Sequence, residues 1–310
     1  MEREAADLPR RPLDELTVII PVKDEAEAIG AVLDEVLGLG LPPERVVVVD
    51  GRSSDDTREI AERKGVVVLV QRGNGKADAV AEGLRVVRTK YVAVMDGDHT
   101  YPAEHLPELL RKAEEDSCDE VIGARAWGRE NIPRLNRVGN RIITETFNAL
   151  YGTRLRDLLS GMYLLRTEAL RSAIFEMSGF SVEAEVAAHI VGSGGKICEA
   201  PIKYRERLGR KKLRAFHGVK IFVDVLRLVW RYNPVVFLLA LTSLLLLPGL
   251  ALGVYVGYHY IFANINFYVK GIIAVVLTSI GLVSLELAAI GVYLRRMELR
   301  LTKLLRSCDE

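Results

Sequence analysis

Residues 233–294 contain only two charged side chains, Lys270 and Glu286. Within this stretch, residues 235–258 and 271–294 form two apolar segments of 24 residues each. A helix of that length spans roughly 36 Å, enough to cross a hydrocarbon core of about 30 Å. A helical hairpin buried in a soluble core is the alternative, but neither segment offers a charged face to water. We therefore predict two transmembrane helices, which excludes a wholly soluble protein.

The charged residues are distributed unevenly around these segments. Residues 1–204 carry 27 basic and 35 acidic side chains, residues 205–232 carry 9 and 2, and residues 295–310 carry 5 and 3. Basic residues flank membrane spans on the cytoplasmic side, and the first 15 residues lack the apolar core of an export signal. We predict a multi-pass protein of the cell membrane with its main body and both termini cytoplasmic. The expected partners of the basic region are membrane lipids, with no nucleic acid partner.

The three cysteines lie far apart in the sequence, at Cys118, Cys198 and Cys308. Their spacing matches neither a metal-ligand motif nor a disulfide framework. We expect three packing residues in a reducing compartment.

Short β-branched runs alternate with amphipathic stretches over the first 125 residues. The runs cover residues 17–22, 45–50, 65–70, 91–96 and 120–125. This alternation predicts an α/β domain with a mainly parallel sheet covered on both faces. A helix-rich segment (131–150), a strand (162–167), a helix (182–191) and a strand (196–204) are expected to follow.

Apolar residues recur at helical spacing between 216 and 230, with basic residues between them. This pattern predicts an amphipathic helix in the membrane interface, although the same helix could instead dock on the α/β domain. The predicted organisation is a tail (1–15), the α/β domain (16–213), the interfacial helix (214–232), two membrane helices (233–294) and a basic tail (295–310).

Acidic residues follow three of the predicted strands: Glu25, Asp50, and the pair in Asp96-Gly97-Asp98. Parallel sheets bind ligands at the carboxyl ends of their strands, so these acids should converge. Two carboxylates suit Mg2+ or Mn2+ bound to a diphosphate. An isolated triplet of this kind would be only a solvated turn, but its place on the sheet favours a metal site. For the neighbouring His99 we favour a surface-loop histidine over a metal ligand.

Two further loops have features of a nucleotide site. Asp50 suits a ribose or a base, while the residues 53–55 that follow suit the N-terminal cap of a helix. The run 73–76 (GNGK) opens another helix, whose N-terminus favours anions together with Lys76.

Nine short motifs, in order over residues 16–213, resemble those of the family 2 glycosyltransferases, and in particular of the polyprenyl-phosphate (dolichyl-phosphate) sugar synthases. They are PVKDE (21–25), VVDGRSSDDT (48–57), GNGK (73–76), DGDHTYP (96–102), GAR (123–125), NIPRLNRVGN (131–140), SG (160–161), GFSVEAEV (179–186) and EAPIKYRERLGRKKL (199–213). The resemblance implies a GT-A fold and inverting, Mg2+- or Mn2+-dependent transfer of a hexose from a nucleotide sugar to a polyprenyl phosphate.

The resemblance also implies roles for individual residues. The nucleotide-binding residues are Pro21, Glu25, Asp50, Lys76 and Asp96, and the metal ligands are Asp96 and Asp98. The acceptor phosphate is assigned to Arg125, Arg134, Arg137, Arg207 and Lys212, and the catalytic residues are Asp98, Arg125 and Arg137. Glu183 and Glu185 match acids that we expect to organise the acceptor-side arginines.

Departures from the family pattern leave the donor open. Gly51 stands where a second acid is usual, and Thr100 stands near a usual glutamine. Mannose from a guanosine donor is favoured, with glucose or N-acetylglucosamine from a uridine donor as the alternative. A different lipid or a protein as acceptor, a processive polysaccharide synthase and a catalytically silent nucleotide-sugar-binding protein are further alternatives. A homo-oligomer formed through the spans is also open.

Glu286 is the one acid within a predicted span. An ionised carboxylate is costly there, so we expect it at a buried helix interface, either with the first span or with another copy of the chain, and we favour this over a lipid-phosphate contact. The small residues near it, Gly281, Ser284, Ala288 and Gly291, allow helices to approach closely.

Overall fold

A computed structural model describes residues 13–170, 182–209 and 234–308. The chain divides into two compact units, residues 1–226 and 227–310. The predicted interfacial helix (214–232) and Lys212 lie outside the described residues.

The first unit contains a seven-stranded sheet with strand order β3-β2-β1-β4-β6-β5-β7. The strands are β1 (Leu16–Val22), β2 (Val46–Asp50), β3 (Val67–Val70), β4 (Tyr91–Met95), β5 (Glu120–Trp127), β6 (Met162–Arg166) and β7 (Ile197–Lys203). Of these, β6 runs antiparallel to both β4 and β5, and the other pairings are parallel. The prediction of a mainly parallel α/β sheet is therefore confirmed.

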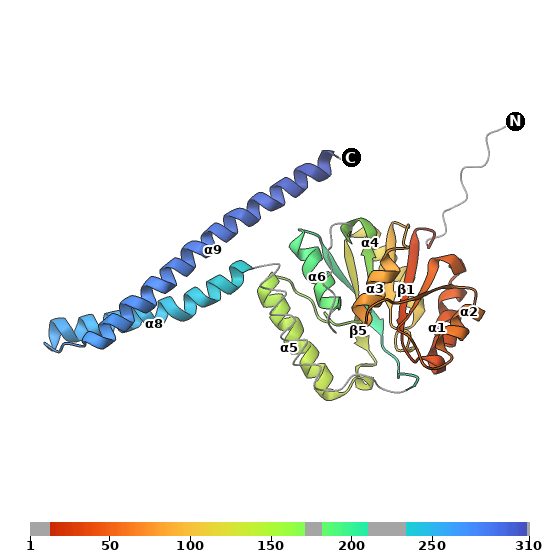
Figure 1. Cartoon of the computed structure of the whole chain (residues 1–310), viewed down its shortest axis with the longest axis horizontal. Helices are drawn as coiled ribbons and strands as arrows, with labels where there is room; N and C mark the ends of the chain where they lie inside the picture. Colours follow the sequence, from red (N-terminus) through yellow and green to blue (C-terminus); the bar gives the residue numbers. More distant parts are fainter. Residues whose placement is uncertain (1–12, 171–181, 210–233, 309–310) are drawn as a thin grey trace. The chain divides into compact units, whose positions relative to one another are not determined.

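Helices cover both faces of this sheet (Figure 1). Side chains of α1 (Ala26–Gly38), α2 (Thr57–Arg63) and α4 (Leu106–Glu115) pack into one apolar core, and side chains of α3 (Lys76–Leu84) and α6 (Val182–Gly192) into the other. Alternate residues of β1 enter opposite cores, with Val18 and Ile20 on one face and Ile19 on the other. The run of buried β-branched residues forms a central strand because both of its faces exclude water.

The helix α5 (Arg134–Tyr151) has one buried and one exposed side. Ile143 and Phe147 are buried, whereas Leu135, Val138 and Ile142 are each more than half exposed. The exposed apolar residues lie at positions i, i+3 and i+7, so they share one face of the helix.

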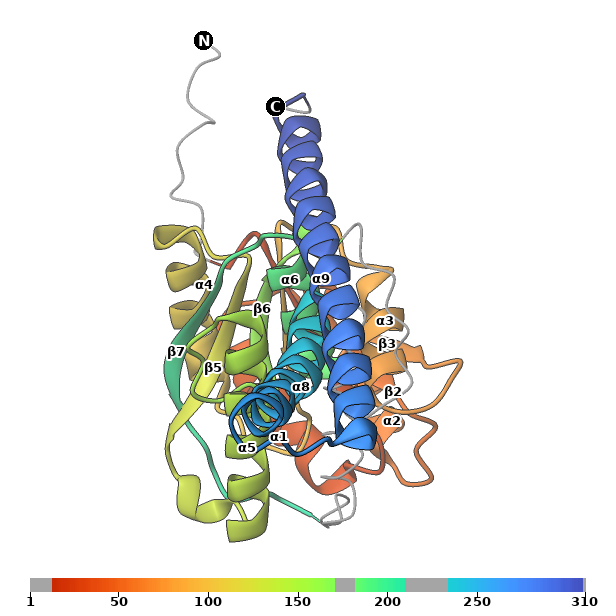
Figure 2. The same cartoon turned by 90° about the vertical axis from the view of Figure 1, so that its left-hand side faces the viewer.

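The second unit is a hairpin of α8 (Pro234–Phe262) and α9 (Tyr268–Cys308), which lie side by side (Figures 1 and 2). Residues 237–262 and 268–294 within them are long and apolar enough to cross a membrane, which suggests membrane association. Gly281, Ser284 and Ala288 are buried in the hairpin, and the Ser284 hydroxyl donates a hydrogen bond to the Leu238 carbonyl at 3.1 Å.

Glu286 does not face α8, contrary to one of the predicted alternatives. Its side chain is exposed on the hairpin, between the buried residues Ser284 and Ala288. A helix turns 100° per residue, so a residue two positions from a buried one faces away from the contact. An interface with another copy of the chain stays a prediction.

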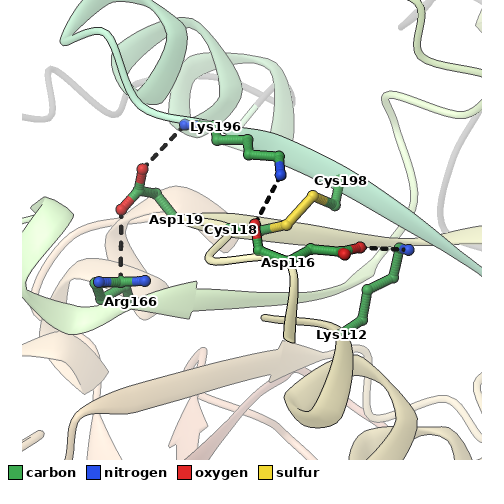
Figure 3. Close-up of a disulfide and its surroundings, with 7 residues drawn as sticks. All are labelled: Lys112, Asp116, Cys118, Asp119, Arg166, Lys196 and Cys198. Atoms are coloured by element: carbon green, nitrogen blue, oxygen red, sulfur yellow. Dashed lines mark hydrogen bonds and ion pairs between the residues drawn. A yellow bond between two sulfur atoms is a disulfide. The ribbon is translucent and has the colours of Figure 1, made fainter. Parts of the chain in front are cut away.

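The prediction that the cysteines are separate packing residues is wrong for two of them. Cys118 and Cys198 form a disulfide across 80 residues of sequence (Figure 3). Cys118 lies just before β5 and Cys198 lies in β7, and these two strands pair in parallel with Val121 opposite Cys198. The sequence separation concealed the pairing because the neighbours of an edge strand are set by the topology of the sheet.

Candidate functional site

The predicted acids converge at the carboxyl ends of β1, β2 and β4. Asp50 closes β2, Asp96 follows β4 directly, and Glu25 lies between β1 and α1. Asp96 and Asp98 point to different cations, so the Asp96-Gly97-Asp98 turn forms two small clusters.

The first cluster contains Lys76, Asp96 and Glu183. The Lys76 Nζ lies 2.6 Å from Asp96 Oδ1 and 2.5 Å from Glu183 Oε1. Burial disfavours the charged lysine, but the charges of Asp96 and Glu183 outweigh this effect and hold the pKa of Lys76 well above its ordinary value. Lys76 is therefore a fixed cation at the N-terminus of α3.

Glu183 differs from its predicted role. It was expected to organise acceptor-side arginines, but its carboxylate holds Lys76, a residue 107 positions earlier. The two meet because α3 and α6 cover the same face of the sheet. No local pattern signals such a pairing.

The second cluster contains Glu25, Asp98 and Arg207. Arg207 Nη1 donates to Asp98 Oδ2 at 2.8 Å, and its Nη2 donates to Glu25 Oε1. Asp98 Oδ1 accepts hydrogen bonds from the backbone N–H of Thr100 at 3.1 Å and from its hydroxyl at 2.5 Å. Arg207, predicted on the acceptor side, instead lies against two acids that we predicted on the donor side.

Asp98 is buried beside a second carboxylate. Burial and the nearby charge of Asp96 raise the pKa of Asp98, although Thr100 and Arg207 partly offset the effect. A divalent cation relieves this kind of repulsion, and carboxylate oxygens are ligands that Mg2+ and Mn2+ prefer. A Cβ at Gly161 would lie 2.1 Å from Asp96 Oδ2, so this glycine leaves room for the carboxylate. Asp96 and Asp98 thus fit a divalent metal.

Two further residues predicted to bind the nucleotide lie in β1 and β2. Asp50 accepts a hydrogen bond from the Ser53 hydroxyl at 2.5 Å and contacts its backbone N–H at 3.2 Å. Pro21 is a half-buried residue of β1, paired in register with Val49 of β2. His99 lies 3.0 Å from Glu35, through its Nε2.

Arg125 is engaged by an acid that sequence reasoning missed. Its Nε donates to Asp157 Oδ2 at 2.7 Å and its Nη2 to Asp157 Oδ1 at 2.6 Å, in a buried, two-point pair. The guanidinium therefore has a structural partner. Arg125 also lines a cavity of about 520 Å³ with Arg129, Arg154 and Arg156. Several arginines around one cavity suit an anionic group, and the role of Arg125 toward the acceptor phosphate stays a prediction.

The remaining acceptor-side arginines lie on α5. Arg134 and Arg137 are exposed on this helix, next to the exposed Leu135 and Val138. Within the described part of the chain, no hydrogen bond or ion pair joins either arginine to the acids of the two clusters.

Comparisons with known proteins agree with this fold. Residues 17–174 match glycosyl transferase family 2. The chain is 33% identical over 267 residues to glycosyltransferase AglJ of Haloferax volcanii, a match covering 84% of this chain and 87% of the relative. It is 37% identical over 207 residues to a dolichyl-phosphate hexose transferase of the same organism, covering 66% and 89%.

Among solved structures, glucosyl-3-phosphoglycerate synthase from Mycobacterium tuberculosis, in complex with Mn2+, UDP-glucose and phosphoglyceric acid, shares the fold. Its TM-score is 0.58 at 21% sequence identity, and the match covers 70% of this chain and 79% of that protein. These matches confirm the GT-A fold and the resemblance to polyprenyl-phosphate sugar synthases. The chain belongs to glycosyltransferase family 2 and is a glycosyltransferase.

Proposed function

We propose that this protein transfers a hexose, preferably mannose, from a nucleoside-diphosphate sugar to a polyprenyl phosphate, with inversion at the anomeric carbon. The observation that carries the proposal is the turn at the end of β4, where Asp96 pairs with Lys76 and Asp98 with Arg207. Acids and cations gathered there suit a diphosphate and its metal.

The donor side consists of residues around this turn. Asp96 and Asp98 would hold Mg2+ or Mn2+, which when bound neutralises charge on the leaving diphosphate. Lys76 adds a fixed cation for the same charge. Pro21, Glu25 and Asp50 would bind the nucleoside, and Arg207 keeps Glu25 and Asp98 in position.

The acceptor side needs to bind a phosphate at a membrane surface. Support comes from the printed name of the dolichyl-phosphate hexose transferase relative and from the two long apolar helices. On α5, Arg134 and Arg137 accompany exposed apolar residues, a combination that suits an interfacial helix near anionic headgroups. Lys212 stays a predicted ligand of the same phosphate.

The chemistry needs no side-chain base. A phosphate monoester has a second pKa of about 6, so it is largely ionised near neutrality. One of its oxygens attacks the anomeric carbon from the face opposite the diphosphate, and the bond to the diphosphate breaks. The protein contributes positioning of the two substrates and neutralisation of charge.

We propose a membrane topology in which the first unit and both termini face the cytoplasm. Basic residues precede the first span and follow the second, whereas the connecting loop 263–267 contains none. A nucleotide-sugar donor made in the cytoplasm would then reach the site directly.

Glucose or N-acetylglucosamine from a uridine donor is the alternative donor, and a different lipid or a protein is the alternative acceptor. A thermal-shift screen with guanosine and uridine diphosphates in Mn2+ distinguishes the donors. A ligand at 100 times its dissociation constant adds about 2.7 kcal/mol to the free energy of unfolding. Mass analysis of the labelled lipid product identifies the acceptor.

The variant Asp98→Asn tests the donor site. It removes one negative charge with little change of shape, so transfer should be abolished while the protein stays folded. The assay measures labelled sugar in the lipid fraction at saturating Mn2+, with the thermal midpoint as the folding control. Substantial turnover by this variant would exclude Asp98 from the reaction.

A further inference from the structure

Glu35, a residue of α1 outside the predicted site, links three parts of the chain. Its Oε1 accepts a hydrogen bond from Arg205 Nη1 and lies 3.0 Å from His99 Nε2. Its Oε2 accepts the backbone N–H of Ala103 at 3.2 Å. One carboxylate thus joins α1 to the turn after β4 and to the segment after β7.

The turn after β4 and the segment after β7 are also joined directly. The backbone N–H of Arg205 donates to the Thr100 carbonyl at 2.8 Å, and that of Leu208 donates to the Asp98 carbonyl at 3.3 Å. The segment therefore runs along residues 98–100, with Arg205 and Arg207 as its two cationic anchors.

One anchor reaches the residue that caps the N-terminus of α1, and the other reaches an acid within α1. Arg207 contacts Glu25, which immediately precedes α1, and Arg205 contacts Glu35, ten residues later. Ten residues correspond to roughly 15 Å along a helix axis. Two well-separated ion pairs restrict the rotation of the segment, which a single pair would allow.

We infer that Glu35 is a positioning residue for the proposed transfer: through Arg205 it fixes the segment that holds Arg207 across Asp98 and Glu25. This inference rests on the proposed function. Glu35 does not touch Asp96, Asp98 or Lys76 in the described contacts, so it acts through the residues that do.

Two observations indicate that a charged carboxylate is needed at this position. Burial opposes ionisation of Glu35, but hydrogen bonds from Arg205 and the Ala103 N–H outweigh it, so the pKa of Glu35 lies below its ordinary value. In addition, His99 has φ = 66°, a left-handed conformation that is uncommon for residues other than glycine. The contact with Glu35 helps to keep His99, and with it Asp98, in place.

The test compares Glu35→Gln with Asp34→Asn in the full-length protein. Asp34 is the preceding residue of α1, and its exposed carboxylate pairs with Lys64, away from the site. The two variants remove the same charge from the same helix. We expect kcat to fall about tenfold for Glu35→Gln and less than twofold for Asp34→Asn, with nucleoside-diphosphate affinity within threefold of wild type for both.

A double variant shows whether Glu35 affects kcat through Arg205 or independently of it. If Glu35 acts through Arg205, then Arg205→Gln alone and the combination Glu35→Gln/Arg205→Gln should each show the same tenfold loss of kcat. Independent losses, which multiply to about a hundredfold in the double variant, would overturn the inference. An unchanged kcat for Glu35→Gln would do so as well.

Hydrogen exchange gives a measurement that does not depend on turnover. In Glu35→Gln, hydrogen exchange should be faster than in wild type in the peptides that cover residues 98–103 and 204–208. In Asp34→Asn, exchange should be unchanged in both peptides. A wild-type protein that transfers no sugar to polyprenyl phosphate would contradict the proposed function. Hydrogen exchange would still decide whether Glu35 holds the segment after β7 in place. Unchanged exchange in either segment would overturn the inference.

Discussion

The Arg125 and Asp157 side chains form a buried ion pair, with side-chain exposures of 10% and 1%. Asp157 also accepts hydrogen bonds from the Arg125 backbone N–H at 2.9 Å and from Asn140 at 2.5 Å. Removing one partner of such a pair leaves a buried charge without compensation, which costs more than the pair itself contributes. This pair joins β5 to the segment that leads into β6.

We therefore predict that Asp157→Asn lowers the free energy of unfolding by about 3–5 kcal/mol. Denaturant unfolding in detergent micelles measures the change. Glu62→Gln is the control, because Glu62 forms an exposed pair with Arg58 and its loss should be nearly neutral. Similar small effects of both substitutions would show that the buried pair is dispensable.

The same variant should show a defined pH dependence. Burial opposes ionisation of Asp157, but Arg125 outweighs it and holds the pKa below its ordinary value. A carboxyl group with a lower pKa in the folded state stabilises the protein fully above the unfolded pKa of about 3.9 and progressively less as the pH falls through the folded pKa. The stability difference between wild type and Asp157→Asn should therefore shrink in acid.

Among the elements of the fold, α5 shows an exposed side that would be unfavourable in water alone. Leu135, Val138 and Ile142 are 63%, 56% and 53% exposed, and Arg134 and Arg137 lie beside them. In contact with a bilayer this side would bury its apolar residues while the arginines meet headgroups.

The triple variant Leu135→Ser/Val138→Ser/Ile142→Ser tests this role. We predict about a tenfold loss of transfer to a long-chain polyprenyl phosphate in liposomes, because less apolar area is available for docking. Transfer to a short-chain, water-soluble acceptor should stay near wild type. Val86→Ser, at an exposed valine outside α5, is the control. Equal losses with both acceptors would assign α5 to another role.

The disulfide stabilises a second element, the edge strand β7. It ties β7 to Cys118, two residues before β5, and β7 leads into the segment that carries Arg205 and Arg207. A cross-link that closes a loop of this length restricts the unfolded chain considerably.

We predict that Cys118→Ser lowers the free energy of unfolding by about 4.5 kcal/mol in the chain-entropy treatment, given the separation of 80 residues. Cys198→Ser should behave in the same way, and the double variant should add nothing. Cys308→Ser serves as the control. Mass analysis of alkylated, non-reduced peptides should recover Cys118 and Cys198 as one linked species, and separate alkylated peptides would contradict the pairing.

At the scale of the whole molecule, the proposed topology has two spans, so the first unit and the end of α9 would face the same side of the membrane. The loop between Phe262 and Tyr268 must then lie on the other side. We predict that Asn264→Cys reacts with an impermeant maleimide in intact cells, whereas the native Cys308 reacts only after permeabilisation. The opposite labelling pattern would reverse the proposed orientation.

The sequence alone determined the features that depend on local physics. Apolar length defined both long apolar helices, and the alternation of β-branched runs with amphipathic stretches defined the mainly parallel sheet. The topology rule for such sheets also placed Asp50 and Asp96 at one edge. These features follow from a side-chain period or a run length, which neighbouring residues specify among themselves.

Only the tertiary structure decided which charged and sulfur-containing side chains meet. Lys76 and Glu183, Glu25 and Arg207, and Cys118 and Cys198 are 107, 182 and 80 residues apart. Their meeting depends on the insertion of antiparallel β6 between β4 and β5 and on the position of β7 beyond β5. Many arrangements of the same strands satisfy the local patterns equally well, and the packing of both sheet faces selects one of them.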